Sequence, residues 1–231
     1  MNTLGKVLIA IVVVIILIGG YFYFRTNKAQ APTNDQAQTT PNPTPAPPTP
    51  SPAATPPASP AASAGSVATI DTNMGSFQVT LDAKSAPLTV ANFIKLANEN
   101  YCNNTKFHRI LKDFVIQGCD PNSIKGDVST WGTGGPGYTV PAEIGLKANI
   151  GAIGMASTAA KGPSSGSQFF IVTTESPNTH ASLDGNYTFF GYVTSGMDVV
   201  TKIAAVPVQP NLQGEPSLPN TPVIINKITI K

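Results

Sequence analysis

The stretch FHRILKDFVIQG, residues 107–118, decides the fold class. Two short runs of aliphatic and aromatic residues flank Lys112-Asp113, which is typical of two strands joined by a tight turn. Side chains alternate between the two faces of a strand, so Val115 and Gln117 share one face. Alternation also separates Arg109 from the histidine before it. The stretch therefore predicts a β-hairpin that presents a few polar side chains beside apolar ones.

Short strand-like runs continue on both sides of this hairpin. They are rich in β-branched or aromatic residues, and turn residues such as Asn73-Met74-Gly75 separate them. The runs are VATIDT, SFQVTLD, KFHRIL, DFVIQG, IGAIGMA, SQFFIVT, YTFFGYV and VIINKITI. So many short strands between Val67 and Lys231 predict a mainly β domain, folded as a closed barrel that leaves no free edge.

Two helices are expected to interrupt these strands. Pro87 suits the first turn of a helix that follows Ser85, because the N–H that proline lacks would be unpaired there anyway. The apolar stripe of this helix is expected to contain Leu88, Ala91, Phe93, Ile94, Leu96 and Ala97. A second helix is expected near Met197–Ala205, ending before Pro207.

Two later segments combine polar and apolar residues in the same alternating way. One is Gly154-Met155-Ala156-Ser157, and the other is Gly166–Ile171. In the second segment, alternation puts Gln168 and Phe170 on one face and Phe169 on the other. Together with the hairpin, these segments predict one surface that combines an arginine, two glutamines and a phenylalanine floor.

At this point the sequence closely resembles the cyclophilins, a family of peptidyl-prolyl cis-trans isomerases. The matching stretches, in family order, are APLTVANF, FHRILKDFVIQG, GTGGPGYTVPAE, IGMAS, GSQFFIVT, LDGNYTFFGYV and the GMDVV helix. They cover essentially all of residues 67–231. The resemblance implies an eight-stranded antiparallel barrel capped by two helices, with the active groove on the outer face of the sheet.

The resemblance also implies roles for individual residues. Arg109 aligns with the catalytic arginine, and Gln117 aligns with the glutamine beside it. The residues that align with the proline pocket and the peptide groove are Phe114, Val115, Ala156, Ser157, Gln168, Phe170 and Leu183. Tyr187 occupies a position usually given to a pocket histidine, and Ser182 stands where many relatives have tryptophan. Val115 replaces a methionine and Ser157 an asparagine, which affects substrate preference more than the reaction.

The implied reaction suits these residue types. An X–Pro bond rotates over a barrier of about 18–20 kcal/mol, because the nitrogen lone pair is delocalised into the carbonyl. A donor aimed at the localised lone pair of the twisted state lowers that barrier, and arginine is always charged with donors in a fixed fork. The expected function is X–Pro isomerisation in exported or surface protein chains, with no metal or cofactor. The alternative is a peptide-binding or chaperone module with little turnover, which loss of Arg109 would indicate.

Other motifs point to other chemistry but lack its context. Residues 162–166, GPSSG, match the G-x-S-x-G elbow of hydrolases, yet a strand-like run follows where the elbow needs a helix. The glycine-rich residues 132–137 lack the ending of a phosphate loop. His108 and His180 are expected to be structural.

The charges of the chain are sparse and balanced. Only 11% of its residues are charged, and the formal net charge is +2. Residues 67–231 contain 11 basic and 11 acidic residues. A neutral domain has no strong electrostatic footprint for nucleic acid, so no nucleic-acid partner is expected. The expected partners are proline-containing polypeptides, and the protein is expected to be a monomer.

An apolar stretch of 18 uncharged residues lies at Val7–Phe24. A helix of this length spans about 27 Å, close to the hydrocarbon thickness of a membrane. It ends in an aromatic run, and Lys6 and Arg25 flank it. The alternative is a cleaved signal peptide, because Ala29-Gln30-Ala31 matches the small-x-small pattern of cleavage sites. The anchor is the preferred interpretation.

Four segments follow from these observations. They are a short head at residues 1–6, a transmembrane helix at 7–24, a disordered linker at 25–66 and an isomerase domain at 67–231. The linker contains eleven prolines and few apolar side chains, which is typical of a polyproline stalk. The expected location is the cell membrane, crossed once, with the domain outside the cytoplasm.

Cys102 and Cys119 lie on either side of the hairpin. In an exported protein such a pair often forms a disulfide. Symmetric pairing about Lys112-Asp113, however, places Cys119 opposite Lys106 rather than Cys102. The sequence leaves both possibilities open.

Overall fold

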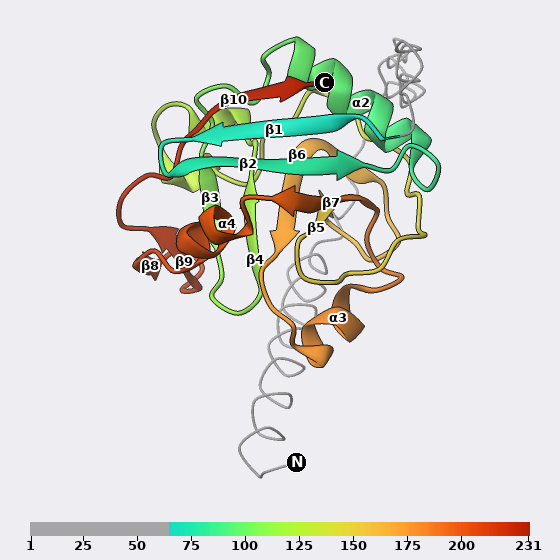
Figure 1. The fold of residues 1–231 in the computed structure, drawn as a ribbon. Helices are drawn as coiled ribbons and strands as arrows, with labels where there is room; N and C mark the ends of the chain where they lie inside the picture. Colours follow the sequence, from blue (N-terminus) through green and yellow to red (C-terminus); the bar gives the residue numbers. More distant parts are fainter. Residues whose placement is uncertain (1–64) are drawn as a thin grey trace, which may run out of the picture. The chain divides into compact units, whose positions relative to one another are not determined.

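The computed structural model describes residues 65–231. Eight strands form one antiparallel sheet in the order β10-β1-β2-β7-β5-β6-β4-β3, which curls around a core (Figure 1). The strands are β1 (Val67–Thr72), β2 (Gly75–Leu81), β3 (Phe107–Ile110), β4 (Val115–Gly118), β5 (Ala152–Ser157), β6 (Ser164–Val172), β7 (Phe189–Ser195) and β10 (Ile225–Ile230). Each of them falls within one of the eight predicted runs or overlaps most of it, so the mainly β prediction is confirmed.

The sheet has two ends, β10 and β3, instead of the fully paired ring that a closed barrel requires. Just before β3, the ends approach through an isolated bridge between Lys106 and Ile224. The Phe107 N–H donates to the Val223 carbonyl at 2.9 Å. Beyond this bridge, β3 pairs with β4 and β10 pairs with β1 in the described sheet, and no ladder joins β3 to β10. The sheet is therefore a curled half-barrel whose ends touch.

The two expected helices are present. Helix α2 (Pro87–Asn98) begins with a proline, and the Glu143 carboxylate accepts from the N–H groups of Leu88 and Thr89 at 3.0 and 2.8 Å. This acidic side chain replaces a local cap. Leu88 is exposed, so its predicted place in the apolar stripe is wrong, whereas Phe93, Ile94, Leu96 and Ala97 are buried. Helix α4 (Met197–Ala204) packs against β2.

Besides two short 3-10 helices, η1 (Pro121–Ser123) and η2 (Val128–Thr130), three elements lie outside the predicted pattern. A short helix, α3 (Pro177–Leu183), follows β6. Strands β8 (Val208–Pro210) and β9 (Pro216–Pro219) form a separate two-stranded sheet that contacts β3. The prolines in these two short strands hide them from a pattern of β-branched residues.

Alternation along β6 divides the interior into two apolar clusters. Phe169 lies in the main core inside the curled sheet, together with Phe77, Phe107, Ile116 and Phe190. Phe170 lies in a smaller cluster on the opposite face, with Val115, Val172, Leu183 and Phe189. The predicted division between Phe169 and Phe170 is confirmed, and the smaller cluster becomes the floor of the site described below.

Cys102 and Cys119 form a disulfide, with their Cα atoms 4.9 Å apart. Phe107 pairs with Gly118, so Cys119 does continue toward Lys106 as the symmetric register suggests. The disulfide still forms because Cys119 adopts a left-handed conformation with φ of 64° and the chain turns tightly after Cys102. In that turn, the Thr105 hydroxyl donates to the Cys102 carbonyl at 2.6 Å.

The predictions for residues 1–6, for the transmembrane helix at 7–24 and for nearly all of the linker at 25–66 lie outside the described residues. Within residues 65–231, no helix is long and apolar enough to cross a membrane.

Candidate active site

A cavity of about 320 Å³ opens on the outer face of the sheet. We call it the Phe170 cavity. Its lining consists of Arg109, Phe114, Val115, Gln117, Ala156, Ser157, Phe170, Leu183 and Tyr187. Nine of the ten predicted site residues thus meet in one cavity, although they come from four strands, a hairpin turn, helix α3 and the loop after it. The tenth, Gln168, contacts the side chain of Gln117.

The floor of the cavity is aromatic. Phe170 makes edge-to-face contacts with Tyr187 and Phe189, with ring centroids 5.5 and 5.6 Å apart. The walls include Val115 and Leu183, both nearly fully buried. A buried aromatic and aliphatic surface of this size accommodates a small apolar ring.

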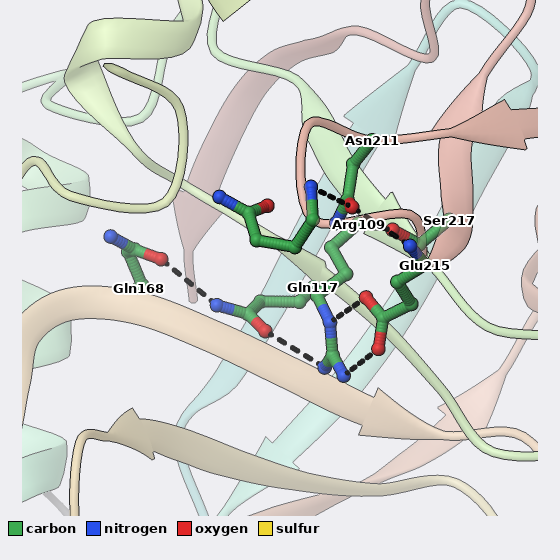
Figure 2. Close-up of polar contacts among 7 residues, drawn as sticks. Arg109, Gln117, Gln168, Asn211, Glu215 and Ser217 are labelled. Atoms are coloured by element: carbon green, nitrogen blue, oxygen red, sulfur yellow. Dashed lines mark hydrogen bonds and ion pairs between the residues drawn. The ribbon is translucent and has the colours of Figure 1, made fainter. Parts of the chain in front are cut away.

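The polar wall is a chain of side-chain amides that ends at Arg109 (Figure 2). Arg109 and Gln117 face each other across the β3–β4 ladder, and Arg109 Nη1 donates to Gln117 Oε1 at 3.4 Å. Gln117 Nε2 donates to Gln168 Oε1 at 2.9 Å, and Gln168 Nε2 donates to the Gly134 carbonyl at 2.8 Å. These directional bonds fix which end of each amide points toward the arginine.

Glu215 holds the other side of Arg109. Arg109 Nε donates to Glu215 Oε2, and Nη2 donates to Oε1, both at 2.8 Å. These hydrogen bonds lower the pKa of the Glu215 carboxyl below its ordinary value. Glu215 comes from the loop between β8 and β9, 106 residues after Arg109. No motif or spacing in the sequence signals this contact.

A second cavity, of about 450 Å³, lies beside the Arg109–Glu215 pair. We call it the Trp131 cavity. Arg109 and Gln117 line it as well as the Phe170 cavity. His108 also lines it, although only 6% of that residue is exposed, and burial lowers the pKa of its imidazole. The two cavities therefore share a wall made of polar side chains.

Two predicted residues have local roles that the sequence did not indicate. Ser157 Oγ lies 2.8 Å from the Ala159 carbonyl and 2.9 Å from the Pro163 carbonyl, so its hydroxyl is engaged by its own loop. Ser182 is exposed on α3, and its hydroxyl donates to the Thr179 carbonyl at 2.7 Å. Ser182 is absent from the lining of the Phe170 cavity, which includes its neighbour Leu183.

The hydrolase-like motif and His180 have structural roles. Ser164, the central residue of GPSSG, is the buried first residue of β6 and its N–H donates to the Val140 carbonyl at 2.8 Å. An elbow needs an exposed serine before a helix, so the prediction against a hydrolase agrees with the geometry. His180 lies within α3, and its Nε2 is 2.9 Å from the Thr174 carbonyl.

The curled sheet and the cavity on its outer face define a domain of the cyclophilin class. A crystal structure of a cyclophilin-type isomerase from Cryptosporidium parvum superposes with a TM-score of 0.60 at 32% identity, covering 72% of this chain and 98% of that one. A second structure of that protein, determined in the presence of the dipeptide Ala-Pro, superposes with the same score at 31% identity, covering 71% of this chain and 98% of that one.

Sequence comparison gives the same assignment. The family described as cyclophilin type peptidyl-prolyl cis-trans isomerase/CLD matches residues 67–230. A peptidyl-prolyl cis-trans isomerase of Arabidopsis thaliana is 39% identical over 140 residues, 60% of this chain and 80% of that protein. One from Helicobacter pylori is 40% identical over 139 residues, 59% of this chain and 78% of that protein. The chain belongs to the cyclophilin-type isomerase family, and it is a peptidyl-prolyl cis-trans isomerase.

Proposed function

We propose that this isomerase holds the proline ring of its substrate in the Phe170 cavity and that Arg109 is its catalytic residue. The observation that carries the proposal is the position of Arg109 at the rim of an apolar cavity, beside the ordered amide of Gln117. The relative solved in the presence of Ala-Pro supports a proline-containing substrate for this fold.

The geometry suits rotation about an X–Pro bond. The aromatic and aliphatic surface around Phe170 clamps the ring, so the carbonyl side of the bond is the part that turns. As the bond twists, the lone pair localises on the proline nitrogen. A guanidinium N–H aimed at that nitrogen stabilises the twisted state more than either planar state, and this difference lowers the barrier. No nucleophile takes part, because no covalent bond is broken.

The test is isomerisation of a short X–Pro peptide by the full chain and by its Arg109→Ala variant. We expect the variant to lose at least tenfold in kcat/KM while its fold and peptide binding survive. Lys227→Ala is the matched control, because it removes one exposed positive charge from β10. Full activity of Arg109→Ala, or loss of wild-type activity with a chelator, would contradict the proposal.

We further propose that residues 7–24 anchor the chain in the cell membrane as a single span, that residues 25–66 form a stalk, and that a monomeric domain acts outside the cytoplasm. The uncharged stretch Val7–Phe24 and its flanking charges support the anchor. The Cys102–Cys119 disulfide supports an oxidising compartment.

Protease added to intact cells tests this arrangement. It is expected to release the isomerase domain, which a blot with an antibody against residues 67–231 would detect. Digestion only after lysis would contradict the orientation, and release of the domain without protease would contradict the anchor. The clients of such a domain would be proline-containing chains during or after export.

A further inference from the structure

We propose that Glu215 is a positioning residue of the isomerase, which holds the guanidinium of Arg109 in the orientation that catalysis requires. The inference rests on the proposed catalytic role of Arg109. It assigns a function to the β8–β9 loop, which contributes nothing to the lining of the Phe170 cavity.

Glu215 holds the guanidinium of Arg109 along one edge of its plane. A guanidinium has five N–H donors in one plane. The Glu215 carboxylate accepts hydrogen bonds from Nε–H and from one N–H of Nη2, at 2.8 Å each, so it occupies one complete edge of that plane. Gln117 takes one N–H of Nη1 at 3.4 Å. The donors that remain are one N–H on Nη1 and one on Nη2, at the end of the fork. A bidentate partner on the side edge thus fixes the plane and leaves the end edge for a substrate.

The loop that carries Glu215 is itself held in place by hydrogen bonds from Asn211. Asn211 Oδ1 accepts from the N–H groups of Gln213 and Glu215, both at 3.0 Å (Figure 2). The Asn211 N–H donates to the Glu215 carbonyl at 2.8 Å, and Asn211 Nδ2 donates to the buried Ser217 hydroxyl at 3.2 Å. These hydrogen bonds order the backbone of the loop before Glu215 binds Arg109. Glu215 therefore orients Arg109 with little further loss of conformational entropy.

The Arg109–Glu215 ion pair affects orientation more than global stability. The side chains of Arg109 and Glu215 are 32% and 33% exposed, so water screens their attraction, and its effect on global stability is small. The orientation of Arg109 depends more on Glu215, because among the described residues the long bond to Gln117 is the one hydrogen bond of the guanidinium that would remain without it. Loss of Glu215 is thus expected to affect the catalytic step more than substrate binding or folding.

The experiment compares the wild type with Glu215→Gln, Glu215→Ala and Glu215→Asp in the full chain. Isomerisation of a neutral X–Pro peptide gives kcat and KM, and a proton–nitrogen NMR correlation spectrum follows the Nε–H of Arg109. The matched control is Glu175→Gln, which removes one exposed carboxylate that belongs to none of the described ion pairs.

We expect kcat to fall roughly three- to tenfold in Glu215→Gln and Glu215→Ala, with KM nearly unchanged. We also expect the Arg109 Nε–H signal to shift and broaden, thermal unfolding to match the control, and Glu215→Asp to recover part of kcat. Unchanged or increased kcat in Glu215→Gln overturns the inference. If Arg109→Ala is inactive in that case, the proposed function still stands. A fully active Arg109→Ala would contradict both the catalytic role of Arg109 and the positioning role of Glu215.

Discussion

Gly154 lies directly against the ring of Phe170: a Cβ added at Gly154 would lie 2.8 Å from Phe170 Cζ and 2.9 Å from Phe189 Cε1. The two positions are paired across the β5–β6 ladder. Because Gly154 has no side chain, the ring of Phe170 can pack directly against the sheet and form the floor of the cavity.

Gly154→Ala should push the Phe170 ring into the cavity, because the Phe189 ring on the other side of the new methyl group is fully buried. We expect kcat/KM for an X–Pro peptide to fall about tenfold, mainly through KM, and the free energy of unfolding to fall by about 1–3 kcal/mol. The control is Gly145→Ala, whose Cβ would meet nothing closer than Ser85 atoms at 3.8 Å. Equal KM values for wild type and Gly154→Ala would contradict this assignment of the floor.

The disulfide gives the second prediction. Cys102 and Cys119 enclose a loop with a sequence separation of 17 that contains Arg109 and Gln117. Reduction should lower the free energy of unfolding by about 3 kcal/mol, since a crosslink of this loop length restricts the unfolded chain. Urea unfolding with and without reductant measures the change. The double variant Cys102→Ala/Cys119→Ala should be insensitive to reductant, and an equal effect of reductant on it would contradict the prediction.

His108 gives the third prediction, which concerns pH. Burial lowers the pKa of His108, and it outweighs the opposing influence of Asp120 and the Lys106 backbone. The unfolded chain therefore binds a proton near pH 6.5 that the folded chain does not bind. Stability is fully present above that pH and is lost as the pH falls through it, by at most about 1.4 kcal/mol per pH unit.

Urea unfolding of the wild type and His108→Phe between pH 7.5 and 5.5 tests this sign, because phenylalanine has a similar size and does not titrate. The wild type should lose more stability than the variant as the pH falls. Parallel curves would show that His108 is solvated in the folded state, and a steeper loss in the variant would reverse the sign.

The sequence predicted the part of the site that depends on local alternation. Alternation along the strands placed Gln117, Gln168 and Phe170 on one face, because successive side chains of a strand point to opposite faces of the sheet. The pairing of Arg109 with Gln117 did not follow, because the symmetric hairpin register puts Arg109 opposite Ile116. A register shift between Phe107 and Arg109 moves the ladder by one residue and brings Arg109 opposite Gln117.

The remaining features depend on contacts that no local pattern encodes. Glu215 reaches Arg109 only because β8 and β9 fold back onto β3. Within the described residues, the two ends of the sheet meet at the isolated Lys106–Ile224 bridge, and a pattern of apolar residues does not show how far two distant strands pair. Leu88 is exposed because the start of α2 turns toward Glu143 rather than toward the core.

The last prediction concerns cyclosporin, for which the resemblance to cyclophilins places a tryptophan at the rim where this chain has Ser182. Ser182 is exposed beside Leu183, which lines the Phe170 cavity, so Ser182→Trp should add a broad apolar face and an N–H donor at that rim. We expect inhibition by cyclosporin to strengthen by roughly ten- to hundredfold, since a rim aromatic buries less area than a core one. Peptide isomerisation should change less, because Arg109 and Phe170 stay in place. Lys84→Trp, which adds an aromatic to an exposed turn that does not line the Phe170 cavity, is the control. Tight inhibition of the parent that Ser182→Trp leaves unchanged would show that this position of α3 lies off the rim.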